Sequence, residues 1–267
     1  MKGNDDQFYE VMLQTITAAS QMPIVKVNRE EFLRSTFKND KYIDDILNKG
    51  PQIVYEPESL RLKAQSIIDN MTKKTSFVSF VTGLSANPLF ATALGGADVI
   101  QYFGFALNLA QQLAYLFGED TLFSGEDTEL SEETKNRLIV YLGVMFGVSS
   151  SSALIVNVSK KAGETIGKKT AAKTLTKTTW YPLIKKTGSL IGRKITKKTI
   201  GKSITKSLPI VGGTISGGLT YLTFKPMGAK LADAFYNELT GQSSMNNDMK
   251  IRKDFIPKNT SQIIDNQ

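Results

Sequence analysis

The sequence predicts an all-α fold, a multi-helix bundle with apolar, glycine-rich helices and a basic Lys/Thr-rich segment. Three observations lead to this prediction. Apolar residues recur at helical spacing along most of the 267-residue chain, and strand-like alternation is scarce. Signals for helix starts and stops bound these stretches. Long runs almost free of charge, in a chain that is 41% hydrophobic, supply enough apolar surface for a core.

Local capping signals place the first helices. Asn28, followed three residues later by Glu31, has the pattern of a capping box and predicts a short helix through EEFLRSTF. Gly50 and Pro51 should end the next helix. Pro57 suits the first turn of a third helix. That helix should bury one apolar face, which consists of Leu60, Ala64, Ile67, Ile68 and Met71.

Residues 75–118 contain a single charged side chain, Asp98, and should be buried in protein or lipid. Asp98 with Gln101 three residues later resembles a second capping box, so we favour a capping role for Asp98 over a functional carboxylate. The helix that follows, residues 99–117, is apolar on nearly every side. The exception is a narrow uncharged stripe of Gln101, Asn108, Gln111 and Gln112.

The next segment changes from acidic to uncharged. Residues 119–133 contain seven acidic side chains and no basic one, which predicts a surface loop. Ser131 should then cap a helix whose first turn carries Glu132 and Glu133. Residues 138–159 are uncharged. That length can span a bilayer with its basic flank in the cytoplasm, but the serines and the asparagine within it favour a helix buried in a soluble bundle.

A third uncharged run, residues 207–224, is unusually rich in glycine for a helix. An interior glycine costs a helix up to about 1 kcal/mol, so this density predicts a close contact that compensates. Either the run crosses another helix tightly inside a globular core, or it is a glycine zipper packed in or against a membrane. The predicted helix-packing residues are Gly212, Gly213, Gly217 and Gly218.

Residues 160–206, here called the basic segment, contain fourteen Lys or Arg side chains and one acidic side chain. The rest of the chain has a net charge of −5, although the whole chain carries +8. The stretch IGKKTAAKTLTK returns 25 residues later as IGRKITKKTIGK, and lysines recur at four-residue spacing. Like charges at this spacing destabilise a helix by a few tenths of a kcal/mol per pair, roughly, so stability does not explain them.

This lysine ladder has three interpretations: a solvated helix face, a nucleic-acid-binding face, or a membrane-binding face. We favour the membrane surface, because only one of the fourteen basic residues is Arg and an anionic bilayer accepts Lys equally well. Trp180 suits an interfacial anchor better than a platform for stacking bases. The predicted membrane- or anion-binding residues are Lys169, Lys173, Lys177, Lys194, Lys198, Lys202, Lys206 and Trp180.

Missing residue types exclude several function classes. The chain contains no Cys and no His, which rules out thiol nucleophiles, Ser-His-Asp triads, disulfides and imidazole metal sites. The stretch AGETIGKKT imitates a phosphate loop, but Ala162 replaces the first Gly of that motif and Lys169 replaces its Ser or Thr. We therefore reject nucleotide binding, and we expect no cofactor, metal or catalytic residue.

The stretches KTLTKTTWYPLIKK, IGRKITKKTIGK and LPIVGGTISGGLTYLTFKPMGAKLADAF together resemble the C-terminal half of bacterial EcsC-family proteins. The uncharged stretch ALGGADVIQYFGFALNLAQQLAYLFGED is similar to the middle region of that family. The resemblance covers roughly residues 75–236. It implies an all-helical, membrane-associated bacterial protein, in some members encoded beside an ABC transporter, and it brings no catalytic residues.

We therefore expect an N-terminal helical extension (1–56), an EcsC-like helical core (57–240) and a flexible C-terminal tail (241–267). The polar, acidic start of the chain lacks the features of a secretory signal, so we expect a cytoplasmic protein peripheral to the inner face of the membrane. The expected function is a non-enzymatic accessory protein whose partners are the anionic membrane and a transporter or another helical protein. The alternatives are a soluble polyanion- or nucleic-acid-binding module and a membrane-perturbing effector.

Overall fold

The structure, a computed structural model, describes residues 2–77, 97–123, 130–159, 181–195 and 217–241. In these ranges it contains α-helices and short 3₁₀ helices and no strand, which confirms the predicted all-α bundle. The described elements are α1 (Lys2–Ser20), η1 (Pro23–Val25), α2 (Arg29–Thr36), α3 (Ile43–Lys49), η2 (Pro51–Ile53), α4 (Pro57–Phe77), α6 (Ala97–Leu116), α7 (Glu132–Met145), α8 (Ser151–Val158), α11 (Tyr181–Ile195) and α14 (Gly217–Leu239).

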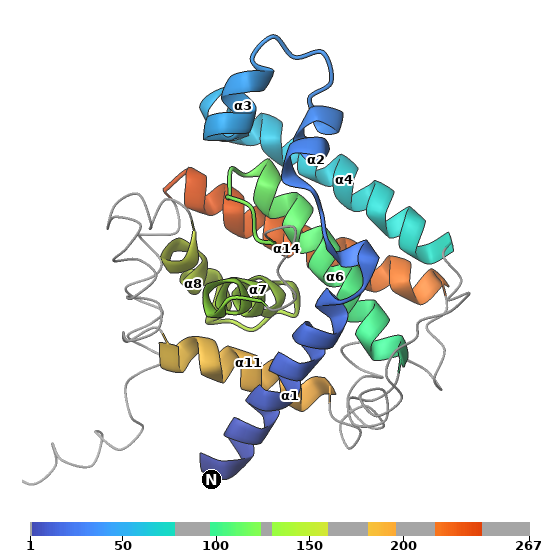
Figure 1. The fold of residues 1–267 in the computed structure, drawn as a ribbon, viewed down its shortest axis with the longest axis vertical. Helices are drawn as coiled ribbons and strands as arrows, with labels where there is room; N and C mark the ends of the chain where they lie inside the picture. Colours follow the sequence, from blue (N-terminus) through green and yellow to red (C-terminus); the bar gives the residue numbers. More distant parts are fainter. Residues whose placement is uncertain (1, 78–96, 124–129, 160–180, 196–216, 242–267) are drawn as a thin grey trace, which may run out of the picture.

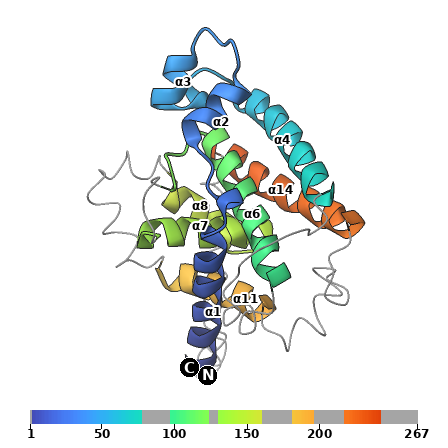
Figure 2. The ribbon, with the colours of Figure 1, turned by 45° about the vertical axis from the view of Figure 1, so that its right-hand side comes forward.

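The described helices are arranged in layers, as two views of the ribbon show (Figure 1, Figure 2). Helices α4 and α14 pack along each other on one side of α6. Helix α7 lies next to α6, and α8 packs against α7. Helices α1 and α11 pack against each other at the end of the molecule that lies opposite α2 and α3. The described helix of the basic segment, α11, is therefore at one end of the bundle.

The predicted caps are confirmed where a side chain meets a free backbone amide. Asn28 Oδ1 accepts a hydrogen bond of 3.0 Å from the backbone N–H of Glu31, so α2 begins where the capping box predicts. Ser131 Oγ accepts a hydrogen bond of 3.1 Å from the backbone N–H of Thr134 and starts α7. Gly50 ends α3 with a φ of 98°, a conformation that glycine adopts without strain.

Helix α4 begins at Pro57, as predicted, and buries the expected apolar face. Leu60, Ala64, Ile68 and Met71 are buried, and Ile67 is half-buried against the core. Its partner α14 comes close at Gly228, where an added Cβ would lie 2.8 Å from Cγ1 of Ile68. A glycine at this point lets the two long helices approach without displacing the core side chains between them.

The uncharged stripe of α6 holds the N-terminal part of the chain in place. Gln111 is fully buried; its Nε2 donates to the backbone carbonyl of Val25 at 2.5 Å, and its Oε1 accepts from the backbone N–H of Val27 at 3.2 Å. Asn108 Nδ2 donates to the carbonyl of Ile24 at 2.6 Å. The stripe thus satisfies backbone groups that η1 and the turn after it leave without helical partners.

Helix α6 starts at Ala97, one residue before the predicted cap residue Asp98. Asp98 therefore lies within the described helix and not at the position before it that a cap residue takes. The segment before α2 also contributes to the core: Tyr9, Met12 and Ile16 of α1 are buried in the same cluster as the side chains of α6 and α7.

The uncharged run of residues 138–159 forms parts of two helices. Helix α7 ends at Met145, the chain turns at Gly147 with a φ of 71°, and α8 begins at Ser151. Both helices are largely buried in the core. Among the described helices, none combines the length and the apolarity that crossing a bilayer requires.

The predicted surface loop at 119–133 is wrong for its first residue. Glu119 is only 4% exposed, because Arg137 on the second turn of α7 folds back over it with Nη1 3.5 Å from Oε2. The guanidinium of Arg137 also lies 3.0 Å from Oε1 of Glu133. A buried carboxylate is stable here because the guanidinium of Arg137 compensates its charge and donates a hydrogen bond to it.

Candidate functional site

Helix α11, the described part of the basic segment, is strongly two-sided. Pro182 suits its first turn, since a helix start needs no backbone N–H there. One face carries apolar and small residues that the structure buries: Leu183, Ile184, Thr187, Gly188, Ser189, Ile191 and Gly192. The other face carries Lys186 and Arg193, which are exposed, and Lys185, which is half-exposed. The sequence of α11 thus directs its cations away from the core.

Two glycines set how closely α11 approaches α1. A Cβ at Gly192 would lie 1.8 Å from the carbonyl oxygen of Phe8, and a Cβ at Gly188 would lie 2.7 Å from a ring carbon of Tyr9. The backbones of the two helices are therefore in contact at this crossing. Sequence reasoning missed it, although the signal was present as two glycines four residues apart in GSLIG.

Replacing Gly192 with Ala should destabilise the protein by about 2 kcal/mol, because the added methyl meets backbone that cannot rotate away. Such a change should lower the melting temperature by about 4–8 °C for a chain of this size. Gly104→Ala is the matched control, since its Cβ would meet the flexible thioether end of Met22 at 2.9 Å and make an ordinary contact with Cγ2 of Val25 at 3.4 Å. That variant should range from unchanged to about 1 kcal/mol more stable. Equal melting temperatures for the two variants would contradict the close crossing.

The cations of α11 lie beside acidic and aromatic side chains of α1. Lys185 Nζ is 2.8 Å from Oδ1 of Asp6, and this carboxylate raises the pKa of Lys185. Arg193 Nη2 is 2.6 Å from Oδ1 of Asp5, and its guanidinium lies 5.1 Å from the ring centre of Phe8. Lys185 and Arg193 remain about half-exposed, so both pairs are in contact with water.

The structure places three of the residues predicted from the sequence. Lys194 lies in the last turn of α11, eight residues after Lys186, and Gly217 and Gly218 are the first two residues of α14. The other predicted residues lie outside the described ranges: Lys169, Lys173, Lys177, Trp180, Lys198, Lys202, Lys206, Gly212 and Gly213. These residues belong to two stretches of the chain: residues 160–180 directly precede α11, and residues 196–216 directly follow it.

A buried polar cluster lies where α6, α7 and α14 meet. It contains Glu119, Arg137 and Tyr141, and the ring of Tyr141 packs edge-on against Phe235 at 5.2 Å. Burial raises the pKa of Tyr141 well above its usual value. Because these side chains are buried, we assign the cluster to helix packing. Within the described residues, no group of acidic side chains is arranged to hold a metal ion.

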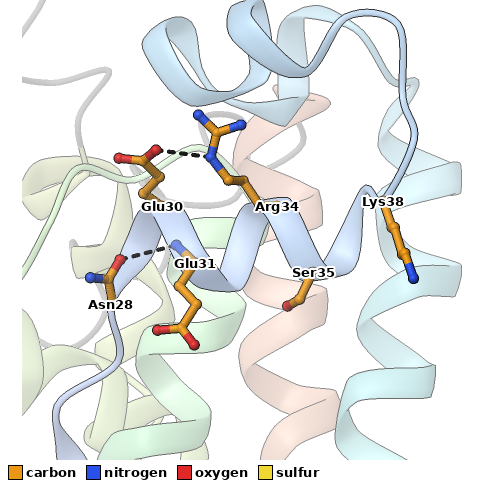
Figure 3. A pocket seen from close by; sticks show the side chains of 6 residues that line it. All are labelled: Asn28, Glu30, Glu31, Arg34, Ser35 and Lys38. Atoms are coloured by element: carbon orange, nitrogen blue, oxygen red, sulfur yellow. Dashed lines mark hydrogen bonds and ion pairs between the residues drawn. The ribbon is translucent and has the colours of Figure 1, made fainter.

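An open hollow lies along α2 (Figure 3), a helix at the end of the molecule away from α11 (Figure 1). Its lining residues are Asn28, Glu30, Glu31, Arg34, Ser35 and Lys38. Glu30 and Arg34 pair with each other at 2.8 Å, and Asn28 caps the helix. The polar side chains of Asn28, Glu30 and Arg34 are thus engaged in contacts within α2, and we assign no reaction to this hollow.

Comparison with known proteins gives no relative from which a role could be carried over: no family model, curated protein or solved structure matches this chain.

Proposed function

We propose that this chain is a non-enzymatic, membrane-associated helical accessory protein that docks on anionic membrane through its basic segment. The observation that supports this proposal is the geometry of α11. Its small and apolar face is packed against α1 and α7 at one end of the bundle. Its described cations are accessible to water: Lys186 is exposed, and Lys185 and Arg193 lie at the edge of the contact with α1 and are 40% and 50% exposed. A flat or gently curved bilayer can reach these cations without any rearrangement of the core.

The composition of the segment favours lipid over nucleic acid as its partner. Thirteen of its fourteen cations are Lys, which binds an anionic surface as a point charge, whereas bidentate recognition of phosphates and bases favours Arg. Each Lys near an anionic leaflet contributes on the order of 1 kcal/mol before screening. A few lysines at the membrane are therefore sufficient for reversible docking.

The family resemblance supplies the finer part of the proposal. The stretches quoted above resemble EcsC-family proteins, so we propose a bacterial, cytoplasmic protein that is peripheral at the inner face of the cell membrane. Its proposed protein partner is a membrane transporter or another helical membrane protein. The glycine-rich residues 207–224, of which the structure describes the last eight, are the segment we propose for close helix packing with such a partner.

Co-sedimentation with lipid vesicles tests the proposal. The full chain should bind vesicles that contain phosphatidylserine and leave vesicles of pure phosphatidylcholine unbound. Binding should weaken as ionic strength rises, because the Debye length falls to about 8 Å near physiological salt. Double-stranded DNA added as a competitor should displace little of the bound protein. Strong binding to DNA without binding to anionic vesicles would contradict membrane docking and favour a polyanion-binding module.

A further inference from the structure

Asp5 and Asp6, here called the acidic pair, lie in the first turns of α1 directly beside the basic face of α11. Asp5 pairs with Arg193 and also accepts a hydrogen bond of 3.2 Å from Ser189 Oγ, while Asp6 pairs with Lys185. The acidic pair therefore engages two of the three cations whose side chains are described on α11. It does so at the face that we propose for membrane docking.

The backbone geometry keeps the acidic pair in this position. Gly192 lets the carbonyl of Phe8 rest on α11, and Tyr9 is buried just after it, so the first turns of α1 cannot drift away from the cations. The ion pairs themselves are exposed, with 60% and 61% of the Asp5 and Asp6 side chains accessible to water. Exposed pairs of this kind contribute little to folding stability. Their main effect is on the charge that α11 presents to its surroundings.

We infer that the acidic pair restrains membrane docking by acting as an internal anion on Lys185 and Arg193. Anionic lipid must compete with Asp5 and Asp6 for these two cations, so the affinity of the chain for the bilayer stays lower than its lysine content would give. This inference rests on the proposed membrane-docking function and adds to it a mode of regulation. Any change that removes the two negative charges should strengthen docking.

The test is the double variant Asp5→Asn with Asp6→Asn, which keeps the side-chain shape and removes both charges. Its affinity for phosphatidylserine-containing vesicles should rise about fivefold or more, because two cations become available to lipid. The matched control is Asp44→Asn with Asp45→Asn. These residues also occupy the first turn of a helix, and Asp45 also pairs with a cation, Lys49, at 3.0 Å.

The control changes the net charge by the same two units but acts at the opposite end of the molecule (Figure 1). Its affinity should change by less than about twofold, since salt screens charges at the far end of the molecule from the docking face. If the wild type binds and the two double variants bind equally tightly, the inference is wrong and the proposed function stands. If neither the wild type nor either variant binds anionic vesicles, both the proposed function and the inference are wrong.

A second background separates ion pairing from direct repulsion of the membrane. In a chain with Lys185→Gln and Arg193→Gln, the Asn exchanges at Asp5 and Asp6 should change the affinity no more than the control does. A full increase in that background would overturn the inference. Circular dichroism and melting curves accompany each measurement, and tighter binding that appears only together with lost helix content also counts against the inference.

Discussion

Exchange of six ladder lysines for Glu should lower the affinity for anionic vesicles about a hundredfold or more, with the helical circular dichroism spectrum retained. The six are Lys169, Lys173, Lys177, Lys194, Lys198 and Lys202. Each Lys near the leaflet is worth on the order of 1 kcal/mol before screening, and each Glu adds repulsion of similar size. The summed loss of binding free energy from six such changes is larger than the reduction that screening at physiological salt causes, so the drop in affinity should remain measurable. Vesicle co-sedimentation measures the effect.

A matched charge reversal outside the basic segment shows whether binding depends on that segment or only on the net charge of the chain. The control converts Lys26, Lys38, Lys41, Lys49, Lys73 and Lys230, which are exposed and lie outside the basic segment, to Glu. Each exchange removes two charge units, so both sets take the net charge from +8 to −4. The control should retain most of the binding. If both sets lose binding equally, the protein is attracted by its overall charge, and the basic segment has no special role.

Replacing Arg137 with Met should cost about 3–5 kcal/mol of folding stability, because it leaves the carboxylate of Glu119 buried without its cation. The side chain of Arg137 is itself only 12% exposed, so solvent cannot replace the lost charge readily. Denaturant unfolding of the variant should show a lower midpoint with a similar slope, since the surface exposed on unfolding hardly changes.

Two further variants identify the carboxylate that matters. Glu133→Gln removes the partner that is 42% exposed, and it should cost no more than about 1 kcal/mol. Glu119→Gln combined with Arg137→Met should recover a large part of the stability lost in the single Arg137 variant, because no unpaired buried charge remains. A double variant as unstable as Arg137→Met alone would show that packing of the Arg side chain, and not the charge on Glu119, accounts for the loss.

The sequence predicted those parts of the fold that depend on neighbouring residues. The Asn28 and Ser131 caps, the stop at Gly50 and the start at Pro57 all lie where predicted, because each is decided within one or two helical turns. The apolar face of α4 was predicted for the same reason, since helical periodicity alone defines it.

Contacts between distant segments were not predicted. The density of glycines predicted a close helix contact in residues 207–224, whereas the described crossing of α1 and α11 depends on Gly188 and Gly192. A glycine in sequence does not reveal which helix will lie against it. Glu119 was assigned to a surface loop from its acidic neighbours, because its partner Arg137 lies 18 residues away. The membrane-binding residues of the ladder remain a prediction from spacing and charge.

The pairing of α1 with α11 also has a consequence for synthesis on the ribosome. Arg193 follows its partner Asp5 by 188 residues. At about 5–20 residues per second, roughly 10–40 s pass between the emergence of the two helices. During this interval Tyr9 and the rest of the α1 face that packs on α11 lack their final cover. We therefore expect the nascent chain to be most open to chaperones, or to premature contact with lipid, before residue 195 has left the exit tunnel.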